Sequence, residues 1–112
     1  MGHIALDAVD LLARMAEAGR DPQEVAAAAE GIAVGWRLDA AAAAEDGDEG
    51  AASPVRRVLM VQELRRWCAV ASSHYALRWE RLCRAGRPEA AAEARRWAEA
   101  LDQAHRALHL YD

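Results

Sequence analysis

Apolar residues recur every three or four positions in four stretches of this chain, which is the spacing of amphipathic helices. The first stretch, over residues 4–18, is followed by Gly19, and glycine is common just after a helix end. Asp21 and Pro22 then supply a helix N-cap and a proline for the first turn. The pattern predicts one helix over residues 4–18 and a second over residues 22–45.

The longest stretch without a helix breaker begins at Ser53 and Pro54, and it predicts one long central helix over about residues 54–85. Such a helix would be roughly 48 Å long, whereas a compact domain of this size is about 35 Å across. We therefore expect the helix to bend, most readily at Ser72 and Ser73, or to have its excess length covered by a second copy or another protein.

A turn at Gly86 precedes the last stretch, which predicts a helix over residues 88–110. An acidic linker, residues 46–53, separates the first two predicted helices from the last two. Because helices joined by short turns pack antiparallel, the predicted fold is all-α: a four-helix bundle built from two antiparallel helical hairpins, forming a single domain over residues 1–112.

Two glycines in the second predicted helix, Gly31 and Gly35, are spaced four apart. In a soluble helix this spacing is typical of close packing against a neighbouring backbone, and a functional hinge is the alternative. We expect close packing here.

Charge is distributed unevenly along the 112 residues, whose net charge is −4. Residues 1–54 contain 3 arginines and 11 acidic residues, while residues 55–112 contain 11 arginines and 7 acidic residues. The two halves can attract each other within one fold or across a dimer. A chain that is acidic overall, with its arginines scattered around the long helix, is not typical of nucleic-acid binding, which remains a minor alternative.

The two cysteines, Cys68 and Cys83, lie fifteen positions apart on the predicted long helix. That spacing corresponds to roughly 22 Å, too far for a disulfide, so we expect free thiols and a reducing compartment. Asp7 and Asp10 interrupt the N-terminal apolar run, no basic segment precedes it, and no stretch approaches the ~20 apolar residues of a membrane span. We expect a cytoplasmic protein that does not associate with membranes.

The best candidate metal site lies near the C-terminus, where four residues are spaced three, four and three apart: Asp102, His105, His109 and Asp112. This spacing places them along one edge of a helix, and histidines four apart can bind a divalent metal ion. Histidine near a helix C-terminus is also favoured by the helix dipole. We favour that structural role and expect no cofactor.

The sequence gives no positive support for catalysis. His74 neighbours Ser72 and Ser73, but residues one or two apart on a helix do not face each other, so they form no nucleophile and base pair. No glycine-rich phosphate loop is present, and paired carboxylates occur only in the acidic linker, which is a poor place to hold a fixed geometry.

The chain carries more large apolar residues than one small bundle readily buries, so we expect a non-catalytic protein–protein interaction or regulatory module that forms a homodimer or binds another protein. The expected interface lies on the long helix and comprises Val55, Val58, Leu59, Met60 and Trp67. The alternative is a small-ligand or metal-binding bundle. Its expected pocket comprises Trp67, His74, Tyr75 and Trp79.

Overall fold

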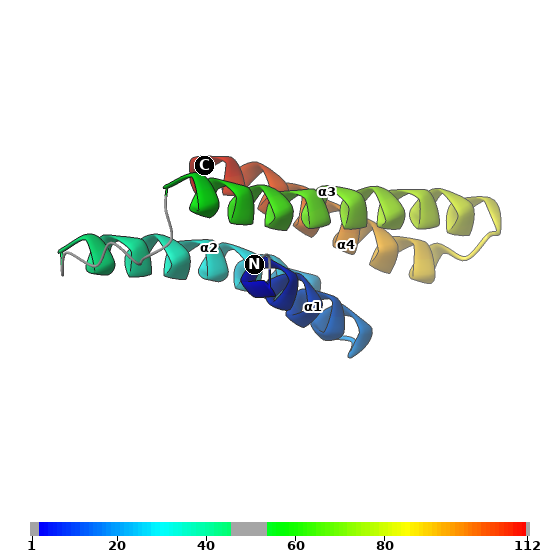
Figure 1. Ribbon diagram of the computed structural model, residues 1–112. Coiled ribbons are helices and arrows are strands. Elements are labelled where there is room, and N and C mark those ends of the chain that lie inside the picture. Colours follow the sequence, from blue (N-terminus) through cyan, green and yellow to red (C-terminus); the bar gives the residue numbers. More distant parts are fainter. Residues whose placement is uncertain (1–2, 46–53, 112) are drawn as a thin grey trace.

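The computed structural model describes residues 3–45 and 54–111, and every regular element in these ranges is helical (Figure 1). The prediction of an all-α fold is confirmed, and the predicted acidic linker over residues 46–53 lies outside the described residues. The elements are α1 (His3–Glu17), α2 (Pro22–Glu45), α3 (Pro54–Arg84), α4 (Pro88–Ala107) and a 3₁₀ helix, η1 (Leu108–Tyr111).

Two similar turns connect α1 to α2 and α3 to α4. Gly19 and Gly86 adopt positive φ angles of 76° and 69°, which reverse the chain at each helix end. At both turns the backbone N–H after the glycine donates to a carbonyl five residues earlier, at 3.1 and 3.0 Å. The Asp21 carboxylate then accepts a hydrogen bond of 2.8 Å from the backbone N–H of Gln23 and caps α2.

α3 is one uninterrupted α-helix that contains Ser72 and Ser73, and Figure 1 shows it running along its whole length without a bend. The Ser72 hydroxyl donates a 2.8 Å hydrogen bond to the Ala98 carbonyl on α4 rather than to its own helix, so it does not distort α3. The molecule accommodates the helix by being elongated, 59 × 21 × 21 Å, instead of the expected globule about 35 Å across.

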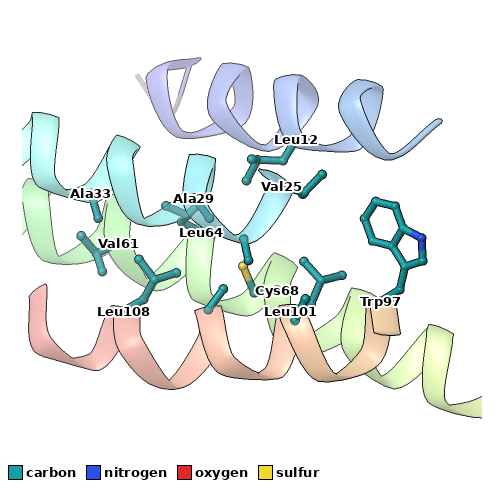
Figure 2. Packing of buried hydrophobic residues seen from close by; sticks show 13 residues of the cluster. Leu12, Val25, Ala29, Ala33, Val61, Leu64, Cys68, Trp97, Leu101 and Leu108 are labelled. Atoms are coloured by element: carbon teal, nitrogen blue, oxygen red, sulfur yellow. The ribbon is translucent and has the colours of Figure 1, made fainter. Parts of the chain in front are cut away.

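The hydrophobic core receives side chains from all four helices (Figure 2). Leu12 of α1, Val25 of α2, Leu64 of α3 and Leu101 of α4 are each fully buried. α3 contacts each of the other helices, as expected of a helix that is apolar on most sides. Burial of these apolar side chains supplies the main driving force for folding.

Close packing of α2 depends on alanine and not on its glycines. Ala29 and Ala33 are buried in the core, whereas a Cβ atom added to Gly31 or Gly35 would meet nothing within 4 Å. The expectation of close packing at the two glycines was therefore wrong. Residues two apart on a helix point about 200° away from each other, so burying the alanines turns the glycines outward.

The α-helical part of α4 ends at Ala107, before the predicted boundary at residue 110, and the chain continues as η1. Leu108 is fully buried, and the guanidinium carbon of Arg37 lies 5.5 Å from the ring centroid of Tyr111. These contacts with the core and with α2 accompany the tightening of the last turn into a 3₁₀ helix. None of the described helices combines the length and apolarity needed to cross a bilayer.

Candidate interaction surface

A groove of about 390 Å³ lies between α1 and α3. Three residues of the predicted pocket, Trp67, His74 and Tyr75, line it together. The remaining lining residues are Ala13, Ala16 and Glu17 of α1 and Val70 and Ala71 of α3. The groove is therefore mainly apolar, with one carboxylate at the C-terminal end of α1.

The fourth residue of the predicted pocket, Trp79, does not line this groove. The guanidinium carbon of Arg95 on α4 lies 5.3 Å from its ring centroid, a cation–π contact between α3 and α4. The ring of Trp97 on α4 instead stacks on Tyr75, with ring centroids 5.2 Å apart. No periodic pattern in the sequence could pair these two rings, because they come from different helices.

A second depression, of about 400 Å³, lies further along α3 and is lined by His74, Leu77, Arg78, Arg81 and Leu82. It shares His74 with the groove. All five residues belong to α3. Past the end of α1, the described helix that runs beside α3 is α4 (Figure 1). We refer to Trp67, Val70, His74, Leu77, Arg78 and Arg81 together as the α3 surface.

Two apolar side chains of the α3 surface are more exposed than buried. Val70 is 63% exposed and Leu77 is 55% exposed, and they lie seven residues apart on one side of the helix. The sequence carried a signal for them, because both residues interrupt what would otherwise be a polar face of α3. Their exposure became evident only once the positions of α1 and α4 were known.

The residues predicted to form an interface on the first turns of α3 differ in how exposed they are. Leu59 is 56% exposed, Val58 is half-buried, and Met60 is buried against the core. The side chain of Val55 lies outside the described residues. Trp67, half-buried in the groove, is the one predicted interface residue that also belongs to the α3 surface.

The candidate metal residues have other contacts. The His105 Nδ1 atom lies 3.2 Å from the Arg65 carbonyl oxygen, and the His109 Nε2 atom lies 3.1 Å from the Arg65 guanidinium. Asp102 forms an ion pair of 3.1 Å within α4, and Asp112 lies outside the described residues. Across residues 3–45 and 54–111, no group of three or more His, Cys, Asp or Glu side chains is placed to hold a metal ion.

Both cysteines are free thiols on α3, and their environments differ. Burial raises the pKa of the Cys68 thiol to about 12, so this residue stays protonated and unreactive at neutral pH. Cys83 is exposed.

Ion pairs on the surface are mostly local, between side chains one helical turn apart. They are Asp10–Arg14, Arg20–Glu24, Glu80–Arg84, Glu93–Arg96, Arg95–Glu99 and Asp102–Arg106. Arg96 also reaches Asp21, at 2.9 Å, and so ties α4 to the turn before α2. Within the part of the chain that the structure describes, Glu17, Arg78 and Arg81 take part in no ion pair.

The spacing of the α3 surface suits recognition of a helix. Trp67, Val70, His74 and Leu77 follow the three-and-four spacing by which one helix packs against another. The groove beside them is bounded by small residues of α1, which leave room for a second backbone. Neither a protein-family model, nor a curated protein, nor a solved structure matches the chain.

Proposed function

We propose that this chain is a non-catalytic protein–protein interaction module that self-associates through the α3 surface and has a regulatory role in the cytoplasm. The observation that carries the proposal is the pairing of two exposed apolar residues, Val70 and Leu77, with an apolar groove directly beside them. An apolar area of this kind is a common mark of an interaction site, because its burial against a partner is favourable.

We further propose that the four helices form two antiparallel hairpins, α1–α2 and α3–α4, and that this bundle presents the α3 surface. The positive-φ glycines Gly19 and Gly86 support the two reversals of the chain. The ion pair between Arg96 and Asp21 supports the packing of one hairpin on the other.

The solution mass, measured by light scattering over a hundredfold dilution in reducing buffer, tests self-association. We expect a dimer at high concentration that dissociates on dilution, with circular dichroism showing unchanged helicity. A monomer at every concentration would contradict the proposal.

Substitutions test which residues form the interface. Val70→Arg and Leu77→Glu should each shift the equilibrium toward monomer, because each would place a charge in a buried apolar contact. Leu110→Glu is the matched control, since Leu110 is 76% exposed and lies on η1. Leu59→Glu tests separately whether the first turns of α3 belong to the same interface.

Small-ligand binding is the second candidate, and the groove that contains Trp67 and Tyr75 favours it. Ligand sites usually bury most of the ligand surface, whereas Val70 and His74 on this groove are exposed. We therefore rank ligand binding below association with a protein. A ligand in the groove would change the tryptophan fluorescence of the wild-type chain and not that of Trp67→Phe.

A further inference from the structure

The groove and the second depression on α3 carry opposite charges. Among the described residues, Glu17 is the only acidic one that lines the groove, and Arg78 and Arg81 are the basic residues that line the second depression. Each of these three charges lacks an ion-pair partner among the described residues. The two hollows have similar volumes, about 390 and 400 Å³, and they meet at His74.

A two-fold axis beside His74 would bring each hollow of one copy against the other hollow of a second copy. Consider two α3 helices that pack antiparallel with His74 at the centre. A residue a given number of positions after His74 in one copy then lies opposite the residue the same number of positions before His74 in the other copy. Arg78, four positions after His74, then faces Val70 of the second copy, four positions before it. Arg81, seven positions after, faces Trp67 of the second copy.

This arrangement places basic side chains beside an acidic one. Val70 and Trp67 line the groove that also contains Glu17, so Arg78 and Arg81 of one copy enter the groove of the other copy. The contact occurs twice, because a two-fold axis makes the interface self-complementary. Opposite charges across such an interface set its orientation and partner choice.

The position of α1 makes the contact sterically accessible. α1 covers only part of the length of α3, and the C-terminal end of α3 extends beyond it (Figure 1). The second depression, which Leu77 and Arg78 line, has no lining residue from α1. That part of α3 is exposed on the side away from α4, where Leu77 is 55% exposed. It can therefore enter the groove between α1 and α3 of a second copy without displacing a helix of its own fold.

We propose, on the basis of the self-association proposed above, that a second copy of this chain docks antiparallel along α3 about a two-fold axis at His74. Arg78 and Arg81 of each copy lie against Glu17 of the other. A second copy fits better than an unrelated helix, because it fills both hollows and pairs the acidic residue with the two basic ones. An unrelated helix in the groove would leave the second depression open.

Charge reversal tests this geometry. Two variants are compared, the single variant Glu17→Arg and the double variant Arg78→Glu with Arg81→Glu. Each places like charges together at both contacts and should raise the dimer Kd by about tenfold or more at low salt. An equimolar mixture of the two variants should form heterodimers of near wild-type affinity, because every contact then pairs opposite charges. Asp39→Arg, an exposed reversal on α2, is the control and should leave the Kd unchanged.

The outcomes separate this geometry from self-association itself. A wild-type chain that is monomeric at all concentrations overturns both proposals. A wild-type dimer that is insensitive to the reversals, or a mixture that does not recover affinity, overturns the axis at His74 and leaves self-association standing. If a reversal lowers helicity, Glu17→Gln and Arg78→Gln with Arg81→Gln replace it, with a smaller expected rise in Kd.

A covalent probe provides an independent measurement. His74→Cys in a Cys83→Ser background should form a disulfide-linked dimer under mild oxidation, because the two copies of residue 74 face each other at the axis. Asp39→Cys in the same background should not. Failure of residue 74 to crosslink in a chain that light scattering shows to be dimeric would contradict the proposed axis.

Discussion

The phenol ring of Tyr75 on α3 lies stacked on the indole ring of Trp97 on α4, with ring centroids 5.2 Å apart and planes inclined by 16°. Trp97 is buried, and Tyr75 lines the groove between α1 and α3. The stack therefore connects the hydrophobic core to the lining of the groove.

Each single substitution in this stack should remove the same favourable ring contact, so the double variant should be destabilised by less than the sum of the two single variants. In a double-mutant cycle of Tyr75→Leu and Trp97→Leu, measured by urea unfolding, we expect a coupling energy of about 0.5–1.5 kcal/mol. Tyr111→Leu combined with Tyr75→Leu is the control and should be additive, since Tyr111 lies on η1 and its ring contacts Arg37. Additive losses for the first pair would contradict a specific ring contact.

Acid should weaken the fold through Asp21. The hydrogen bond from the Gln23 backbone N–H, assisted by Arg96, holds the pKa of Asp21 below its ordinary value of 3.8. The unfolded chain therefore takes up this proton at a higher pH than the folded chain does. The resulting stability is present above about pH 3.8 and is lost as the pH falls through the lower folded value.

The measurement is the urea midpoint between pH 2 and 5 for the wild type and for Asp21→Asn, which keeps a capping oxygen and removes the charge. We expect the urea midpoint of the wild type to exceed that of the variant at pH 5, and this difference to shrink steadily as the pH is lowered. A constant difference across this range would show that the charge of Asp21 contributes nothing.

The two thiols should differ sharply in reactivity. At pH 8, an aromatic disulfide reagent should label Cys83 rapidly, whereas Cys68 should react only after unfolding, because burial raises its pKa to about 12. The native protein should therefore release one equivalent of chromophore and the denatured protein two. Cys83→Ser should abolish the native signal, and rapid labelling of that variant would contradict the burial of Cys68.

Buried Cys68 should also make the fold sensitive to alkali. The unfolded thiol ionises near its ordinary pKa of 9.0, while the folded thiol ionises near 12, so its contribution to stability is present below pH 9 and is lost toward pH 12. Cys68→Ala should reduce the steepness of the alkaline unfolding curve, and an unchanged curve would contradict this assignment.

Alanine at Gly31 and Gly35 of α2 should stabilise the protein, because an added Cβ atom meets nothing within 4 Å at either position. Gly31→Ala and Gly35→Ala add a methyl group to open space in a helix interior, and each should raise the free energy of unfolding by about 0.4–1 kcal/mol. Gly19→Ala is the opposing control and should destabilise, because Gly19 has a φ of 76° that an alanine rarely adopts. Thermal melting of the three variants distinguishes these outcomes.

The helix boundaries were largely predictable because their causes are local. Pro22, Pro54 and Pro88 begin three helices, and Gly19 and Gly86 follow two helix ends. Caps and first-turn prolines act within one turn of the chain, so their effect can be recognised without knowing what packs above them. The exception is the end of α4, where contacts of η1 with distant residues determine the last turn.

The candidate site was predictable only in part. Trp67, His74 and Tyr75 lie on adjacent lines of one helix, so their common placement followed from helical periodicity. The same periodicity placed Trp79 with them, but its ring contacts Arg95 of α4 and does not line the groove. Periodicity groups residues by face and does not say which faces other helices cover.

The local pattern of residues was enough to predict that the chain folds into helices, where most of them begin and end, and that α3 is long. The packing of the helices was needed to show that α3 runs without a bend in a molecule 59 Å long, and that Val70 and Leu77 stay exposed. Helix formation depends on residues within a turn of each other, whereas exposure depends on the packing of segments far apart in the chain.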